Sequence, residues 1–375
     1  MTSYYLDIHV LQSVPPSNVN RDDTGAPKTA LYGGVRRARV SSQAWKKAVR
    51  SSFAEFIDPE QRGERTLRVV ELLINRLAEI APHLSAEQAR ERAIAVVNAL
   101  DLKTEKPRSK NNDDLIERTQ YLVFYSKPQL DRLAALAATA EDKVSKREAK
   151  RAADSDHGIE VGLFGRMVAD SRDLNVDAAV QVAHAISTHA VENEGDFYTA
   201  VDDYKLDEDD AGAGMMGTIE FNSSTLYRFA TVDLTELRGN LTGDVPLTAE
   251  AAAAFVRGFI TSMPTGKQNT FGNNTLPDGA VVQLRRGRSA SYVGAFESAV
   301  TADGGYMGNS AEALASYATS LQEAFLEAPH ASFVTLAGTQ TAALASLGTQ
   351  LPLTQLLEQV TTAVTDALDS EAAPS

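Results

Sequence analysis

The spacing of hydrophobic positions predicts that the chain begins with strands and a short helix. Residues 4–14 alternate and are rich in aromatic and β-branched side chains, which is typical of a strand, and residues 35–40 suit a second, shorter strand. Trp45, Val49 and Phe53 recur at a spacing of four, which places them on one face of a helix. Either Ser41 or Ser42 can cap the start of this helix.

The middle of the chain, residues 60–155, has the apolar spacing of helices, clearest at 68–80, 86–100 and 129–140. The segment 141–156 is charged and poor in apolar residues, so we interpret it as a solvated helix or a mobile loop.

The last part of the chain mixes strands and helices around one unusual segment. Residues 192–217 hold nine Asp or Glu, one Lys and a Gly-rich run, so no core can be built from them and we expect a long excursion. The other elements expected here are strands at 180–186, 218–221, 225–233, 281–285 and 291–297, helices at 248–263, 311–326 and 353–368, and a disordered tail at 369–375. This order suits an α+β protein with an open antiparallel sheet and the ferredoxin-like pattern of RNA-recognition domains.

Composition narrows the class of protein. The 375 residues are 43% hydrophobic, which is ample for a core in one elaborated domain or in two. There is no Cys, and hence no disulfide or thiolate site. Neither a secretion signal nor an apolar run of membrane-spanning length is present, so we expect a cytoplasmic protein with no membrane segment.

Charge singles out residues 20–50. The chain has a net charge of −14, yet this segment contains eight Lys or Arg against two Asp. Such an excess is usually compensated by a bound polyanion. The basic residues fall on a loop, a strand and a capped helix start, where helix dipole and free N–H groups also favour anions.

Candidate catalytic chemistry is sparse. The six His residues form no His-Glu-x-x-His motif, and neither a Gly-x-Ser-x-Gly motif nor a phosphate-binding Gly-rich loop is present. Asp22 and Asp23 could bind Mg²⁺, but adjacent loop carboxylates more often pair with nearby Arg. We therefore expect no metal and no cofactor. The apolar residues Met167 and Phe197 stand beside Gly-rich or acidic segments, and they either pack on the protein or wedge against bases.

Several motifs resemble CasC, the repeated backbone subunit (Cas-seven family) of the type I-E CRISPR interference complex, Cascade. They run from the first strand to past residue 270, and together they are highly specific. The matching segments are 8–11, 20–23, 33–43, 163–167 (Leu-Phe-Gly-Arg-Met), 181–189, 198–203, 217–218, 226–228 and 268–270, with Lys28, Lys46 and Arg50.

The resemblance implies an RNA-recognition-type palm at 1–59 and 181–375, a helical fingers insertion at 60–180 and a thumb at 194–217. It also implies a non-catalytic protein whose copies polymerise along a guide RNA (crRNA) with other Cascade subunits and support pairing to target DNA.

Site residues follow from the same resemblance. The guide backbone would be held by Arg21, Lys28, Ser41, Gln43, Lys46, Arg50 and Arg166, with Met167 and Phe197 flanking a kinked nucleotide. Lys143, Lys146 and Lys150 are expected to face target DNA, although their segment matches no motif. The alternative is a metal-dependent endoribonuclease that uses Asp22 or Asp23.

Overall fold

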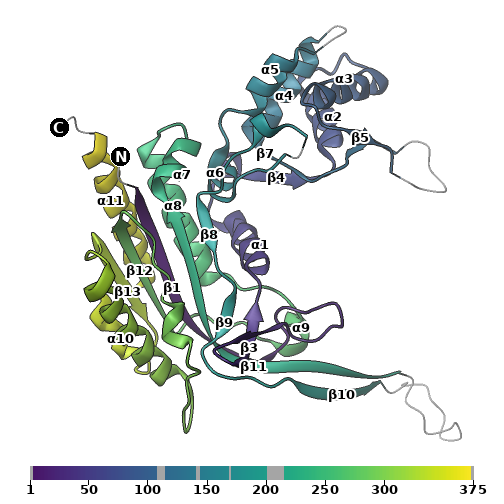
Figure 1. The fold of residues 1–375 in the computed structure, drawn as a ribbon. Helices are drawn as coiled ribbons and strands as arrows, with labels where there is room; N and C mark the ends of the chain where they lie inside the picture. Colours follow the sequence, from purple (N-terminus) through teal and green to yellow (C-terminus); the bar gives the residue numbers. More distant parts are fainter. Residues whose placement is uncertain (1–2, 108–114, 141–143, 169, 201–214, 373–375) are drawn as a thin grey trace, which may run out of the picture. The chain divides into compact units, whose positions relative to one another are not determined.

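A computed structural model describes residues 3–107, 115–140, 144–168, 170–200 and 215–372 (Figure 1). The chain divides into two compact units. Unit 1 comprises residues 1–52, 181–231 and 255–367, and unit 2 comprises 53–180, 232–254 and 368–375. Residues 232–254 and 368–375, which the sequence-based boundaries give to the palm, therefore belong to the unit that contains the helical middle of the chain.

A largely antiparallel sheet forms unit 1, so the chain is a mixed α+β protein as expected. Its strands follow the order β14-β13-β12-β1-β11-β9-β3-β2, with β8 and β10 also paired to β11. The bounds are β1 (Tyr4–Ser17), β2 (Thr29–Tyr32), β3 (Val35–Val40), β8 (Val180–Val182), β9 (Ala185–Ser187), β10 (Glu194–Ala200), β11 (Met215–Asp233), β12 (Gly279–Arg286), β13 (Ala331–Leu336) and β14 (Thr349–Gln350). The β2–β3 turn consists of Gly33 and Gly34, whose φ values of 58° and 78° are those that a two-residue hairpin requires.

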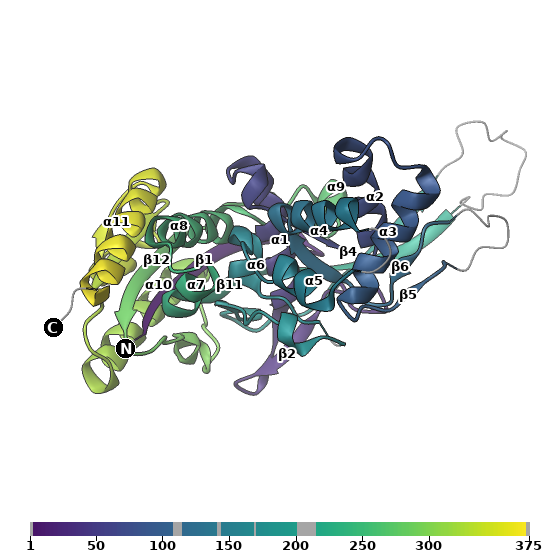
Figure 2. The same cartoon turned by 90° about the horizontal axis from the view of Figure 1, so that it is seen from above.

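Helices α10 (Met307–Phe325) and α11 (Leu353–Ala372) lie at the β12–β13 end of this sheet in both views (Figures 1 and 2). Leu314 of α10 is buried in a core cluster with Val281 of β12 and Val334 of β13. At the other end, α1 (Ser42–Ser52) buries Trp45 in a second cluster with Val40 and Leu226. The remaining elements are α8 (Val245–Thr261), which is divided between the units, and α9 (Gln268–Phe271).

Unit 2 is a helical cluster with two small two-stranded sheets, β4-β7 and β5-β6. Its helices are α2 (Val69–Ile80), α3 (Ala86–Ala99), α4 (Lys127–Thr139), α5 (Lys146–Ala153), α6 (Gly158–Phe164) and α7 (Leu234–Asn240), and its strands are β4 (Gly63–Thr66), β5 (Thr104–Glu105), β6 (Arg118–Thr119) and β7 (Val123–Ser126). Helices α3 and α4 each begin with a capping box, Ser85 with Gln88 and Ser126 with Gln129. The three helices expected from periodicity here are confirmed.

For the charged segment 141–156, the two predicted alternatives are a solvated helix and a mobile loop. Its described residues favour the helix. Residues 146–153 form α5, and Ala149 and Ala153 are buried. A helix with a narrow stripe of small apolar residues packs while its Lys and Arg stay solvated, which is why the composition resembled a loop.

Some expected elements are wrong. Residues 293–296 form a 3₁₀ turn rather than a strand, and Phe296 is buried. Helix α8 begins at Val245 instead of at Thr248, because Asp244 Oδ1 accepts a hydrogen bond from the Leu247 N–H at 2.9 Å. The strand expected at 180–186 is interrupted between β8 and β9, and α11 extends into the tail expected to be disordered.

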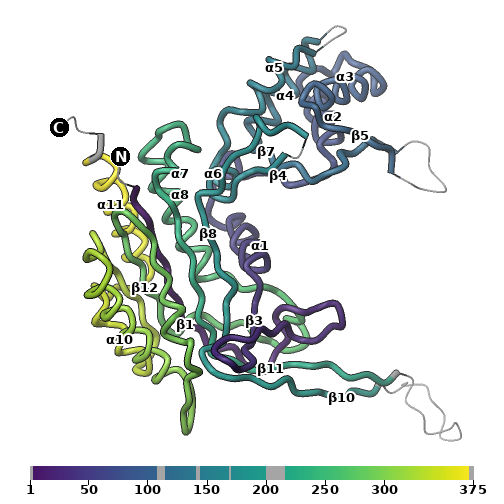
Figure 3. The backbone as a smooth tube through the Cα atoms, in the orientation of Figure 1, coloured from purple at the N-terminus to yellow at the C-terminus, as the bar shows by residue number. Residues whose placement is uncertain are grey.

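The acidic excursion begins and ends as a β-ribbon. Strand β10 pairs with the first half of β11, and the ribbon projects from the rest of unit 1 (Figure 3). Tyr198 lies opposite Gly217, and a Cβ built on Gly217 would be 2.6 Å from the Tyr198 hydroxyl. The Tyr198 ring therefore covers the glycine, a packing that favours this register. Residues 201–214 lie outside the described residues.

Candidate nucleic-acid interface

Helix α1 starts at a cap that ties three segments together. The Ser41 hydroxyl accepts from the Ala44 N–H at 3.4 Å, and the Ser41 N–H donates to Asn20 Oδ1 at 2.9 Å. The Ser42 N–H donates to His184 Nδ1 at 2.9 Å. Ser41 is buried by this arrangement, and the RNA contact expected of its side chain stays a prediction.

One face of α1 carries a polar stripe. Gln43, Lys46, Lys47 and Arg50 recur at positions that share a helix face, opposite the buried Trp45. Gln43 and Lys47 are exposed, whereas Lys46 and Arg50 are half-buried. Partial burial lowers the pKa of Lys46. We call these four residues the α1 stripe; it has the donors and charge to bind an anion.

The loop before β2 is folded tightly by Asp22. Its Oδ1 accepts from the Thr24 hydroxyl at 2.7 Å, the Thr24 N–H at 2.9 Å and the Ala26 N–H at 3.1 Å. The hydrogen bond from the Thr24 side chain is the largest cause of a lowered Asp22 pKa. The carboxylate thus organises the loop that presents Arg21, which is exposed, and Lys28, which is half-buried.

His184 lies close to two cations, Lys28 and Arg39, at the start of α1. Partial burial lowers its pKa, and the charges of Arg39 and Lys28 lower it further. Because Nδ1 accepts from the Ser42 N–H, the neutral ring carries its proton on Nε2, where it is a donor. Lys28, Arg39 and His184 therefore form a basic cluster beside the first turn of α1.

Arg37 is fully buried, although Arg36 before it is exposed. Its guanidinium donates only to backbone carbonyls, at distances from 2.7 to 3.3 Å. The acceptors are the carbonyls of Tyr32, Ser187, Thr188, Phe296 and Glu297. Arg37 is therefore a structural residue that joins the β2–β3 hairpin to two other segments of unit 1.

A second buried arginine holds the apolar face of α1. The Arg228 guanidinium lies 3.7 Å from the centre of the Trp45 ring and donates to Gln12 Oε1 at 2.6 Å. It also donates to the Phe259 carbonyl. Burial lowers the pKa of Arg228 to about 9, so it stays charged at neutral pH. This stacking fixes the helix whose other face carries the α1 stripe.

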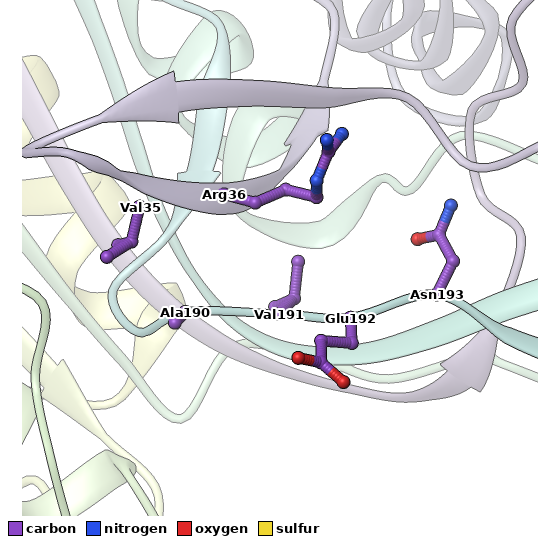
Figure 4. A pocket seen from close by; sticks show the side chains of 6 residues that line it. All are labelled: Val35, Arg36, Ala190, Val191, Glu192 and Asn193. Atoms are coloured by element: carbon purple, nitrogen blue, oxygen red, sulfur yellow. The ribbon is translucent and has the colours of Figure 1, made fainter.

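An open hollow of about 700 Å³ lies beside β3 and the segment that leads to β10 (Figure 4). Arg36 and Asn193 point to the same side of it, whereas the Glu192 carboxylate points the other way. The remaining lining residues are Val35, Ala190 and Val191. These six lining residues include no nucleophile–base pair.

The ribbon exposes apolar side chains on one face. Phe197 and Met216 are 63% and 62% exposed. Phe197 pairs with Thr218 and Met216 with Thr199, so all four side chains point to one side of the ribbon. No described residue of unit 1 buries Phe197 or Met216, which leaves both side chains able to contact a base or another chain.

In unit 2, Met167 and Arg166 are adjacent but lie in opposite environments. Met167 is 82% exposed. Arg166 is buried and donates to the Leu174 carbonyl at 2.7 Å and the Ala153 carbonyl at 3.0 Å. Its guanidinium is engaged by its own chain, and the RNA contact expected of Arg166 stays a prediction.

The lysines expected to face DNA are paired with carboxylates. Lys146 Nζ lies 2.5 Å from Asp101 Oδ1. Lys150 Nζ lies 3.1 Å from Asp101 Oδ2 and 2.8 Å from Asp173 Oδ2. A polyanion would have to compete with these carboxylates. Lys143 lies outside the described residues.

Comparison with known proteins identifies the family. The model of the family described as CT1975-like protein matches residues 6–361. The chain belongs to the CT1975-like family. A chain of a solved "CRISPR RNA-guided surveillance complex, pre-nicking" is 34% identical with a TM-score of 0.82, over 96% of this chain and 100% of that one. A chain of a "CRISPR RNA-guided surveillance complex" is 29% identical with a TM-score of 0.71, over 95% and 99%. No curated protein matches.

The described part of this CT1975-like chain offers no metal site. No group of three or more His, Asp or Glu side chains in it is arranged to hold a metal ion. Asp22 is one of the two carboxylates considered for Mg²⁺, and its Oδ1 accepts three hydrogen bonds from its own loop. None of the helices within the described ranges is long and apolar enough to cross a membrane.

Sequence reasoning counted Lys47 and Arg39 in the basic segment 20–50 of this CT1975-like chain without assigning them to the site, and it missed His184. The helical spacing from Gln43 to Arg50 could have included Lys47. No local signal could have added His184, because it reaches α1 only through the pairing of β9 with β3.

Proposed function

We propose that this protein is the non-catalytic backbone subunit of a CRISPR surveillance complex and binds the guide RNA through its phosphates. The observation that carries the proposal is the α1 stripe together with the basic cluster at the start of the same helix. These residues place cations and neutral donors on one rigid element of a chain whose net charge is −14. Such groups bind phosphates and read no sequence.

The family and the matching solved structures support the same role. Chains of RNA-guided complexes align with nearly all of this chain. In such complexes base pairing supplies the sequence specificity, so the protein needs only to hold the RNA backbone.

The proposal also covers the type of complex, its location in the cell and the residues that contact RNA. We place the protein in a type I-E Cascade in the cytoplasm, with an RNA-recognition-like palm, and with copies that polymerise along the guide and support its pairing to target DNA. In this arrangement the exposed Phe197 of the ribbon and Met167 of the fingers contact a displaced nucleotide. Arg21, Lys28, Gln43, Lys46 and Arg50 hold the backbone.

A salt-dependence measurement tests the proposal. The variant Lys46→Ala/Arg50→Ala should bind single-stranded RNA of any sequence more weakly, and its plot of log K against log salt should be shallower by about 1.4, since each lost phosphate contact removes about 0.7. Arg286→Ala/Arg288→Ala is the matched control, because it removes two exposed cations at the end of β12. Equal slopes in the wild type and the α1 variant would refute the placement of RNA on α1.

A further inference from the structure

Unit 2 exposes two large side chains at the turn between β6 and β7. Tyr121 is 59% exposed and Leu122 is 50% exposed. Neither residue is used by the interface described above, and they belong to a different unit from α1. The helices of unit 2 have their own buried core, to which neither residue belongs.

The backbone beneath Tyr121 is firmly held. The Thr119 hydroxyl donates to the Tyr121 carbonyl at 2.8 Å, and the Thr119 N–H donates to the Leu67 carbonyl at 2.9 Å. On the other side, the Gln120 N–H donates to the Lys103 carbonyl at 3.1 Å. The ring is therefore presented from a fixed turn, so little backbone entropy is lost when a ligand contacts it.

Cations surround this turn. Lys103 directly precedes β5, Arg118 lies on β6, and Arg65 lies on β4, which pairs with β7. Lys103, Lys106 and Arg65 are exposed, and Arg118 is half-buried. None of the four forms an ion pair with another described residue.

Register places two of these cations on the same side of the β5–β6 hairpin. Thr104 pairs with Thr119 and Glu105 with Arg118. Because side chains alternate along a strand, Lys103 and Arg118 lie on the outer face, whereas Thr119 faces inward and is buried. Three carboxylates lie nearby: Glu105, which is opposite Arg118 in the register, Glu64 on β4, and Glu117, which pairs with Arg90 at 2.9 Å. The cations still outnumber them, in a chain whose net charge is −14.

We propose that this surface of unit 2 binds single-stranded nucleic acid, with a base stacked on Tyr121 and phosphates held by Lys103 and Arg118. An aromatic ring beside unpaired cations is the combination by which proteins hold single strands without reading sequence. A second copy of this chain is a poorer occupant, because the apolar area is only two side chains and the surrounding cations would require an acidic partner surface. The proposal does not rest on the placement of RNA on α1.

The test is a binding titration of the full chain with labelled single-stranded RNA, single-stranded DNA and duplex DNA. Tyr121→Ala should weaken binding of a single strand about 5- to 150-fold, the range that one stacked base provides, with an unchanged salt slope. Tyr121→Phe keeps the ring and should stay within about twofold of the wild type. Phe325→Ala is the matched control, since it removes an exposed aromatic residue from unit 1.

A second variant and a cross-link separate the possible outcomes. Lys103→Ala/Arg118→Ala should make the salt slope shallower by about 1.4 even in the Lys46→Ala/Arg50→Ala background, so failure of one site does not hide the other. Thio-substituted RNA and DNA strands, cross-linked and mapped by mass spectrometry, show which strand lies on Tyr121. Equal affinities of Tyr121→Ala and Phe325→Ala would overturn the proposal, as would a Tyr121→Ala defect only in self-association measured by light scattering.

Discussion

Arg36 and Arg37 are adjacent arginines with opposite roles. Replacing each one in turn distinguishes a residue that stabilises the fold from one that lies on the surface. Arg36 is exposed, and its guanidinium donates to the Thr29 hydroxyl at 2.9 Å. Arg37 is fully buried and donates to five backbone carbonyls. We expect Arg37→Met to destabilise unit 1 strongly and Arg36→Met to have little effect.

The magnitude follows from the acceptors that Arg37→Met would leave behind. The shortest bonds, 2.7 Å to the Thr188 carbonyl and 2.9 Å to the Phe296 carbonyl, would lose their donor inside the protein. A buried acceptor without a donor costs about 1–3 kcal/mol. Allowing for relaxation of the weaker three, the free energy of unfolding should fall by about 2–5 kcal/mol. Arg36→Met, an exposed substitution, should change it by about 0.5 kcal/mol or less.

Trp45 provides the assay, because it is the single tryptophan of the chain and is completely buried in unit 1. Its fluorescence during urea unfolding reports the midpoint and slope for this unit. Salt-dependent RNA binding of the folded Arg37→Met protein should keep the wild-type slope, since no phosphate contact is removed. The reasoning would be refuted if Arg37→Met unfolded within about 1 kcal/mol of Arg36→Met.

Two further predictions concern His157 in unit 2 and Arg228 in unit 1. Burial, and then the charge of Arg166, lower the pKa of His157 to about 4, so between pH 6.5 and 4 the unfolded state holds a proton that the folded state lacks. The free energy of unfolding of unit 2 should therefore fall by up to about 1.4 kcal/mol per pH unit as the pH drops through this window. Hydrogen exchange of α4 should show the fall, and His157→Gln should reduce it. Arg228→Lys should lose about 1–2 kcal/mol of the stability reported by Trp45 fluorescence because an ammonium cannot stack on that ring; an altered RNA salt slope would contradict this positioning role.

Periodicity predicted most helices because their core-facing residues are close together in the sequence. The helices of unit 2 around 68–80, 86–100 and 129–140 show this, as does α1, whose Trp45 and Val49 are buried. The 3₁₀ turn at 293–296 was mistaken for a strand, because a short apolar segment such as Tyr292 to Phe296 is buried equally well in either conformation.

Side-chain environment was the part that local sequence could not supply. In the segment 35–40, Arg36, Arg37 and Arg39 are chemically identical, yet one is exposed, one is buried and one is half-buried. The alternation of β3 explains why Arg36 and Arg37 differ, but which side is buried depends on strand β9 and on the turn at 293–296, both distant in sequence. Arg166 beside Met167 repeats this contrast in unit 2.

The two buried arginines of unit 1 explain how an acidic chain can hold a basic surface in a fixed shape. Arg37 anchors the β2–β3 hairpin through backbone carbonyls, and Arg228 anchors α1 through Trp45. Neither offers its charge to a ligand, yet each fixes an element whose exposed side is cationic. The entropy of ordering these elements is therefore lost during folding and not during binding. Under the proposed function, a guide RNA would have to immobilise only side chains such as Lys46, Lys47 and Lys28, which favours firm binding that does not depend on base sequence.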